Sequence, residues 1–169
     1  MFSGTGTAFD FDIADFLNEL DMPIFKIASG DLRTLPLLKY ISKFNKPMII
    51  STGGASFENI DAAIKTIRKF HNEVAILQCT ASYPAGFEQL NLNVIKRLRE
   101  IYPENVIGYS GHDNGIAMPV VAYTLGARVI EKHFTLNRAL KGTDHAFSLE
   151  PQGLQKMVRD LDRAAVALG

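Results

Sequence analysis

The chain has 169 residues, 47% of them hydrophobic and 21% charged, which is typical of a globular protein with enough apolar material for one core. Lysine plus arginine and aspartate plus glutamate number 18 each, so the zero formal charge argues against nucleic acid and anionic membranes as partners. The single Cys79 cannot form an internal disulfide, and neither a signal peptide nor an apolar run near the ~18 residues of a membrane span is visible, so we expect a cytoplasmic protein.

Apolar periodicity predicts strands and helices in strict alternation along the chain. Ser56 and Asn91 are expected to cap two of the helices, and Gly126 has the position of a left-handed helix terminator. The predicted strands cover residues 5–8, 24–28, 48–50, 74–77, 106–107 and 128–133, and the predicted helices, caps included, cover residues 11–20, 35–44, 56–67, 91–102, 117–125 and 150–165.

Such alternation predicts a parallel sheet built from right-handed strand–helix–strand units. We count six βα units, whereas a closed (β/α)₈ barrel has eight and typically ~250 residues. No linker or low-complexity segment interrupts the pattern. The prediction is therefore one α/β domain over residues 1–169, with the architecture of an incomplete TIM (β/α)₈ barrel.

Two apolar strands each run into a histidine. Val106 and Ile107 lead to His112, and Val129 and Ile130 lead to His133. Neighbouring parallel strands would bring the two imidazoles together at one edge of the sheet, where they could bind a divalent metal ion. The alternative is that each histidine is an ordinary hydrogen-bonded structural residue.

Lys26 lies within an otherwise apolar strand, on the face opposite Phe25 and Ile27. An ammonium there could hold a phosphate together with Ser29, Ser51 and the backbone N–H groups near Gly53. It could instead form a Schiff base with a carbonyl substrate, as in an aldolase, or pair with a structural carboxylate. Because the other predicted strands also end in small or reactive residues, we expect the ligand site at their carboxyl ends.

Six motifs in a fixed order resemble the N-acetylneuraminate (sialic acid) synthase family. The resemblance covers the chain from about Thr7 to its end. The motifs are KIASGD (Lys26–Asp31), ISTG (Ile50–Gly53), QCTASYP (Gln78–Pro84), IGYSGH (Ile107–His112), EKHFT (Glu131–Thr135) and KGTDH with SLEP (Lys141–Pro151).

The resemblance implies a (β/α)₈ barrel that condenses phosphoenolpyruvate with an N-acetylated amino sugar aldehyde, such as N-acetylmannosamine, to a nonulosonic acid and releases phosphate. It implies a divalent cofactor, Mn²⁺ or Mg²⁺. The residue roles that it implies are metal binding by His112 and His133; phosphate binding by Lys26, Ser29, Ser51 and Thr7; contact with the carboxylate of phosphoenolpyruvate by Ser110 and Tyr83; proton transfer by Asp31; and approach to the sugar by Asp144.

The sequence also departs from the family pattern. Two strands that precede residue 5 in the family are absent, as is a carboxyl-terminal domain resembling antifreeze proteins, and Ala81 and Gly111 replace residues that bond or carry charge in some relatives. An open barrel exposes strand edges. We therefore expect that this chain alone is marginally stable, associates with itself as a homodimer or otherwise, or is a fragment of a longer protein, and that by itself it has little or no turnover. The alternative function is an inactive remnant that binds metal or phosphate or complements another chain.

Overall fold

The computed structural model describes residues 4–169. The chain divides into two compact units, the first ending at Leu77 and the second beginning at Gln78. Each unit is described by itself, and strand β4 (Val74–Cys79) runs from the first into the second. Residues 4–169 contain six strands that alternate with six α-helices. The alternation predicted from the sequence is therefore confirmed.

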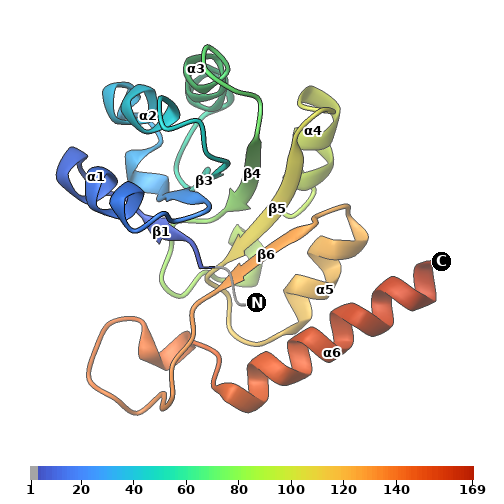
Figure 1. The fold of residues 1–169 in the computed structure, drawn as a ribbon. Helices are drawn as coiled ribbons and strands as arrows, with labels where there is room; N and C mark the ends of the chain where they lie inside the picture. Colours follow the sequence, from blue (N-terminus) through green and yellow to red (C-terminus); the bar gives the residue numbers. More distant parts are fainter. Residues whose placement is uncertain (1–3) are drawn as a thin grey trace. The chain divides into compact units, whose positions relative to one another are not determined.

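The first unit is a parallel sheet with its helices on one side (Figure 1). Strand β1 pairs with β2, β2 with β3, and β3 with the start of β4. The elements are β1 (Gly6–Thr7), α1 (Phe11–Glu19), β2 (Phe25–Ile27), the short 3₁₀ helix η1 (Ser29–Asp31), α2 (Leu35–Ser42), β3 (Met48–Ser51) and α3 (Phe57–Ile67).

Side chains alternate between the two faces of this sheet. One face carries residues that are at most 5% exposed, namely Phe25, Ile27, Met48, Ile50, Val74 and Ile76. Phe25 stacks on Phe44, just beyond the end of α2, with ring centroids 5.6 Å apart, so this face packs against the helices. Lys26 and Ser51 lie at the alternate positions and point to the other face.

Two of the three α-helices in the first unit, α1 and α3, begin with a side-chain cap. Asp10 caps α1, its Oδ1 accepting a hydrogen bond from the Ile13 N–H at 2.8 Å. Ser56 caps α3 as predicted, in a reciprocal capping box with Asn59. Several apolar side chains of and beside α1 are nevertheless exposed, among them Phe9, Phe16 and Leu20.

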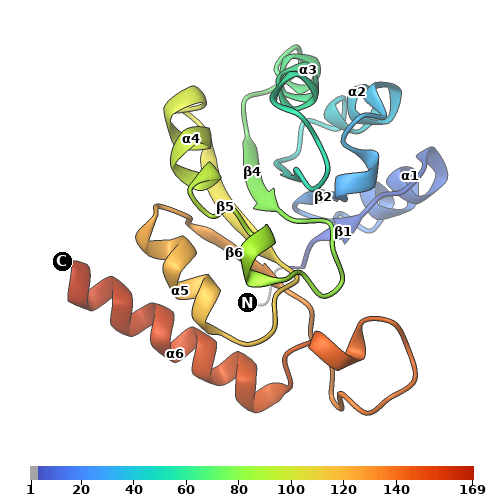
Figure 2. The ribbon, with the colours of Figure 1, turned by 180° about the vertical axis from the view of Figure 1, so that it is seen from behind.

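The second unit contains two paired parallel strands and three α-helices. Its elements are the end of β4, the 3₁₀ helix η2 (Phe87–Gln89), α4 (Val94–Ile101), β5 (Val106–Gly111), α5 (Ala117–Thr124), β6 (Val129–Lys132), the 3₁₀ helix η3 (His145–Phe147) and α6 (Pro151–Leu168). Helices α4 and α5 lie on one side of β5 and β6, and α6 packs along α5 (Figures 1 and 2).

Two local predictions in this unit had opposite outcomes. Gly126 has a φ of 109° and ends α5 as expected, with the Ala127 N–H donating to the Ala122 carbonyl. The prediction that Asn91 caps the next helix was wrong. Helix α4 begins three residues later, after Asn93, and the Asn91 side chain donates instead to the Gln89 carbonyl in a turn where Asn91 itself has a φ of 48°. An asparagine side chain stabilises such a turn as readily as a helix start.

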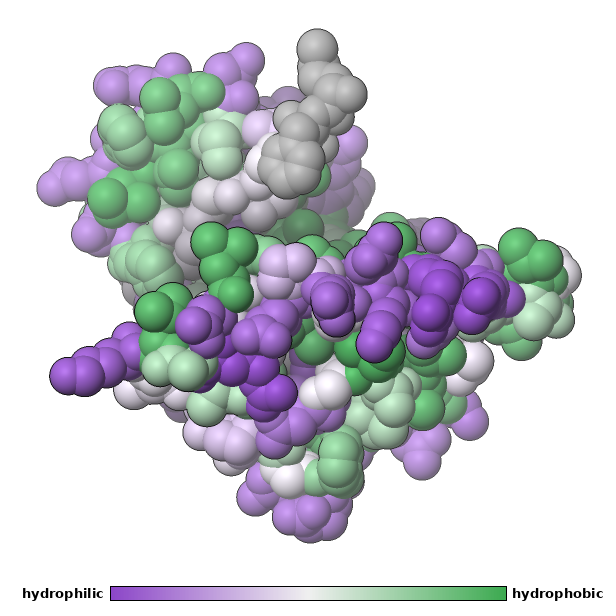
Figure 3. Space-filling model, turned by 90° about the horizontal axis from the view of Figure 1, so that it is seen from below, coloured by the Kyte–Doolittle hydropathy of each residue, from purple (hydrophilic) through white to green (hydrophobic). Residues whose placement is uncertain are grey.

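Helix α6 buries little of its surface. Viewed from below, its outward side is mostly hydrophilic (Figure 3). Met157 is the one buried residue of α6, at 5% exposure, while Val158 and Val166 are exposed. None of the helices within residues 4–169 is long and apolar enough to cross a membrane. The self-association expected from exposed strand edges stays a prediction.

The order of elements confirms the predicted fold class. Six parallel βα units in succession are three quarters of the eight that a (β/α)₈ barrel contains. The architecture is an incomplete barrel, and the carboxyl ends of its strands carry the candidate site residues.

Candidate functional site

In the first unit, a buried lysine and two serines lie at the carboxyl ends of β2 and β3. We call Lys26, Ser29 and Ser51 the Lys26 cluster. The Lys26 ammonium donates to Ser51 Oγ at 2.8 Å and to the Ile27 carbonyl at 3.1 Å. Ser29 Oγ accepts a hydrogen bond from the Gly53 N–H at 3.0 Å. The cluster combines a cation, hydroxyl groups and a backbone N–H in a loop, which together can bind an anion.

Two other predicted site residues, Thr7 and Asp31, lie in the first unit. Thr7 is the registered partner of Lys26 on the neighbouring strand, so the two side chains point to the same face. Asp31 closes η1 and is partly buried. Burial raises the pKa of Asp31, so its carboxyl group holds a proton to a higher pH than an exposed aspartate does. That shift suits a group that transfers protons.

In the second unit, the structure brings the two predicted histidines together. His112 follows β5 and His133 follows β6 directly, and their ring centroids are 5.1 Å apart. We call these two residues the imidazole pair. His112 is buried and His133 is partly exposed. Their closeness follows from the strand register, in which Gly111 pairs with Lys132 one residue earlier.

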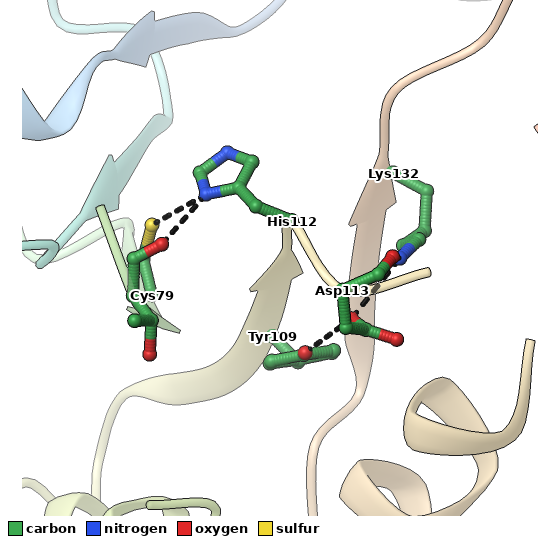
Figure 4. A network of polar contacts seen from close by, with 6 residues as sticks. Cys79, Tyr109, His112, Asp113 and Lys132 are labelled. Atoms are coloured by element: carbon green, nitrogen blue, oxygen red, sulfur yellow. Dashed lines mark hydrogen bonds and ion pairs between the residues drawn. The ribbon is translucent and has the colours of Figure 1, made fainter. Parts of the chain in front are cut away.

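The tautomer of His112 is fixed by its neighbours. Its Nδ1 lies 2.7 Å from the Thr80 carbonyl, which can only accept, so Nδ1 carries the proton. The Cys79 sulfur is also near Nδ1, at 3.9 Å (Figure 4). The lone pair of Nε2 then points away from these partners. An N–H donated to a carbonyl is the usual arrangement behind a metal-binding histidine.

His133 lies between a carboxylate and aromatic rings. Its Nδ1 is 3.5 Å from Asp144 Oδ2, and its ring centroid is 5.0 Å from that of Phe147. Tyr83 lies across the ring of His112, with centroids 4.1 Å apart. The structure therefore gathers Tyr83, Asp144 and the imidazole pair, four of the residues singled out in the sequence, in one place. The ring of Phe147 packs with those of Tyr83 and the imidazole pair, and Phe147 is only 3% exposed. It was not predicted from the sequence.

The pKa values of the two imidazoles shift in opposite directions. Burial lowers the pKa of His112, but hydrogen bonds to Cys79 and Thr80 and nearby negative charge outweigh it, so the net shift is upward. For His133, burial is the main cause of a lowered pKa, and the positive charge of His112 adds to it despite Asp144. A metal ion requires the neutral form of both rings. The lowered pKa of His133 therefore favours metal binding, whereas the raised pKa of His112 opposes it as the pH falls.

Ser110 occupies the same strand face as His112. Its Oγ donates to Glu131 Oε1 at 2.8 Å, and Ser110 and Glu131 are registered partners on β5 and β6. The predicted role of Ser110 near a carboxylate would require its hydroxyl to turn from Glu131 toward the ligand. Within residues 4–169 no group of three histidine, cysteine, aspartate or glutamate side chains converges as a metal site, so the imidazole pair would supply two ligands and leave other positions to substrate or water.

Gly111 lies at the end of β5, where a side chain would not fit. A Cβ there would be 2.5 Å from the Tyr109 ring and 2.7 Å from Asp113 Oδ1. The absence of a side chain at Gly111 therefore leaves room for Tyr109 OH to donate to Asp113 Oδ1 at 2.6 Å.

We expect Gly111→Ala to lower the free energy of unfolding by about 1–3 kcal/mol, the usual cost of forcing a methyl group into a packed interior. Urea unfolding monitored by circular dichroism measures it. Gly30→Ala is the matched control, because a Cβ at Gly30 would meet no atom within 4 Å. Equal stability of the two variants would show that the space at Gly111 is not needed.

Comparison with known proteins places these residues in a family. Residues 2–169 match the NeuB family. The chain is 40% identical over 165 residues to N-acetylneuraminate-9-phosphate synthase from Homo sapiens, a match that covers 98% of this chain and 46% of the human protein. It is 42% identical over 166 residues to N,N'-diacetyllegionaminic acid synthase from Campylobacter jejuni, covering 96% of this chain and 49% of that protein.

The fold of the chain also matches that of a solved structure. The chain matches N-acetylneuraminic acid (sialic acid) synthetase from Leptospira borgpetersenii, crystallised with citrate, with a TM-score of 0.93 and 37% identity. The match covers 96% of this chain and 57% of that one. The chain thus spans about half the length of the curated relatives that it matches.

Proposed function

Because the chain belongs to the NeuB family, we propose that it condenses phosphoenolpyruvate with the aldehyde form of an N-acetylated amino sugar, giving a nonulosonic acid and phosphate. The observation that carries the proposal is the set of side chains at the strand ends. One unit presents a buried ammonium beside hydroxyl groups, and the other presents two imidazoles 5.1 Å apart. The ammonium and hydroxyl groups suit the phosphate of a phosphorylated enol, and the imidazoles suit a metal ion that would polarise a carbonyl substrate.

The Lys26 cluster is proposed to bind the phosphate group of phosphoenolpyruvate. Lys26 is 7% exposed, and in such a setting an ammonium forms strong charge-assisted hydrogen bonds with phosphate oxygens. Ser51, already bonded to Lys26, and Thr7, its registered neighbour, add hydroxyl donors on the same face. The phosphate held in this way is the leaving group of the reaction.

The imidazole pair is proposed to bind a divalent metal ion, Mn²⁺ or Mg²⁺. The residues fit such an ion, because the Nδ1–H of His112 is taken by the Thr80 carbonyl and its Nε2 is left as the donor atom. When bound, the ion would polarise the aldehyde carbonyl of the sugar. Two nitrogen ligands favour Mn²⁺ over Mg²⁺, which prefers oxygen.

The proposed reaction needs proton transfer as well as binding. The C2–C3 double bond of phosphoenolpyruvate supplies the electrons for a bond from C3 to the aldehyde carbon, whose oxygen takes up a proton and becomes a hydroxyl group. Water then adds at C2 and loses a proton, and the bond between C2 and the phosphate oxygen breaks, which releases phosphate and leaves a ketone at C2. Asp31, whose pKa is raised by burial, is proposed to move the proton of that water. Tyr83 and Ser110 are proposed to hold the carboxylate of phosphoenolpyruvate, and Asp144 to approach the sugar.

Sugar-dependent phosphate release tests this function. The purified chain is incubated with phosphoenolpyruvate, N-acetylmannosamine and Mn²⁺, and phosphate is measured over time. We expect slow release that stops when either the sugar or the metal is omitted. The chain matches about half of each relative, and this favours one alternative, a protein that binds Mn²⁺ and phosphoenolpyruvate without turnover. Binding of both with no release would favour that alternative.

Borohydride trapping separates the proposal from a lysine aldolase. A Schiff base between Lys26 and pyruvate would be reduced to a stable adduct, detected by mass spectrometry. We expect no adduct, since Lys26 already donates to Ser51 and to a carbonyl. An adduct that Lys26→Ala abolishes would establish the aldolase in its place.

A further inference from the structure

A buried ion pair lies directly behind the imidazole pair. Lys132 immediately precedes His133, and Asp113 immediately follows His112. The Lys132 ammonium lies 3.0 Å from Asp113 Oδ1, and it also donates to the Asp113 backbone carbonyl. This contact joins the end of β6 to the chain that leaves β5, so each of the two histidines is bonded covalently to one member of a single cross-strand ion pair.

The pair is shielded from water and held by a third residue. The side chains of Lys132 and Asp113 are 2% and 0% exposed. Tyr109 OH donates to Asp113 Oδ1 at 2.6 Å, and Tyr109 is itself fully buried. Lys132 and Tyr109 therefore fix the position of the Asp113 carboxylate from two directions.

The ion pair and the imidazoles point to opposite sides. Successive side chains of a strand alternate between faces, so Lys132 points away from the face that Glu131 shares with Ser110. Figure 4 shows the His112 ring directed toward Cys79, away from the contact between Asp113 and Lys132. The ion pair can therefore hold the two strand ends together without occupying space where a ligand would bind.

Stability alone explains this arrangement poorly. A buried ion pair is often no more stabilising than apolar residues of the same size. Asp113 Oδ2 is buried and has no hydrogen-bond partner among the described residues. A buried oxygen without a partner opposes folding. The pair does supply directional contacts beside each histidine. Lys132 makes two contacts to Asp113 and Tyr109 makes one, and Asp113 and Lys132 are each one residue from a histidine.

We propose that Asp113 and Lys132, supported by Tyr109, are positioning residues that set the separation and orientation of His112 and His133 for one shared divalent ion. The inference rests on the proposed function, because it assumes that the imidazole pair binds metal. Removal of the ion pair should then weaken metal binding even in a protein whose stability is unchanged.

The test compares metal affinity with stability in a variant that replaces the pair by apolar residues. In Lys132→Met/Asp113→Leu, we expect Mn²⁺ binding, measured by isothermal titration calorimetry on the 169-residue chain, to weaken roughly 10- to 100-fold, the usual effect of disturbing groups that orient metal ligands. The unfolding midpoint should stay at or above that of the parent chain. The control Lys65→Met/Asp61→Leu removes an exposed ion pair of α3 and should change neither quantity.

A further variant, Tyr109→Phe, keeps the proposal testable even if the double variant does not fold. If the double variant does not fold, Tyr109→Phe removes a single hydrogen bond and keeps the ring; it should weaken Mn²⁺ binding at least ~3-fold and alter the electron paramagnetic resonance spectrum of the bound ion. Unchanged affinity in the folded double variant, or in Tyr109→Phe when the double variant is unfolded, overturns the positioning role.

The failure of this inference can be told apart from the failure of the proposed function. His112→Ala/His133→Ala serves as the reference. If that variant binds Mn²⁺ as the parent chain does, the metal site itself is wrong and the positioning role falls with it. If it loses Mn²⁺ while the variants of the ion pair keep it, only the positioning role is wrong.

Discussion

The His112→Ala/His133→Ala variant is expected to bind Mn²⁺ at least ~100-fold more weakly than the parent chain, a loss of about 2.7 kcal/mol in binding free energy. The two imidazoles are 5.1 Å apart, and no third histidine, cysteine, aspartate or glutamate joins them as a metal site within residues 4–169. The chain would therefore lose both of its nitrogen ligands. Isothermal titration calorimetry measures the change, with circular dichroism to show that the variant is folded.

His71→Ala is the control for this experiment. His71 lies in the turn after α3, in the first unit, where its Nδ1 accepts a hydrogen bond from the Glu73 N–H. Its replacement should leave Mn²⁺ affinity unchanged. Equal affinity of the parent chain and the double histidine variant would remove the metal site from the account, whatever the family relation.

Replacement of Lys26 by methionine is expected to weaken binding of phosphoenolpyruvate by roughly 100-fold. Methionine keeps the length of the side chain and removes its charge. A charge-assisted hydrogen bond in a buried site contributes about 1.5–3 kcal/mol, and Lys26 would form at least one with the phosphate. The Lys26 ammonium also orients Ser51 Oγ at 2.8 Å, so the loss extends to a second donor. Competition against a fluorescent phosphate analogue, or calorimetry, gives the affinity.

Lys39→Met is the matched control, since Lys39 is an exposed lysine of α2. Its removal changes the net charge by the same amount and should leave the affinity for phosphoenolpyruvate within about twofold, because an exposed charge in water contributes little. If Lys26→Met and Lys39→Met bind phosphoenolpyruvate equally well, the phosphate does not contact Lys26.

The periodicity of the sequence was sufficient to predict the fold class. Short apolar runs of two to four residues predicted most of the strands, and stripes such as Ile60, Ala63, Ile64 and Ile67 predicted the helices, because burial on one face imposes those spacings. Strand β5 is longer than predicted. It continues through Gly111, past residues that look like a turn, because Tyr109 is buried and Ser110 and Gly111 pair with β6.

The candidate site was predictable where position along a strand determines direction. Lys26, His112 and His133 could be singled out because each is a polar residue within or just after an apolar run. The ion pair between Asp113 and Lys132 could not, since sequence separation gives no information about which charge on one strand meets which on another. Nor could the bond between His112 and the Thr80 carbonyl, because any residue type supplies a backbone carbonyl.

The most direct test of the central claim follows the oxygen that links phosphate to C2 of phosphoenolpyruvate. With that bridging oxygen labelled as ¹⁸O, and with N-acetylmannosamine and Mn²⁺ present, condensation breaks the bond between carbon and oxygen. The account predicts, by mass spectrometry, released phosphate that carries the label and forms only when the sugar is present. Unlabelled phosphate, or release that does not need the sugar, would contradict it.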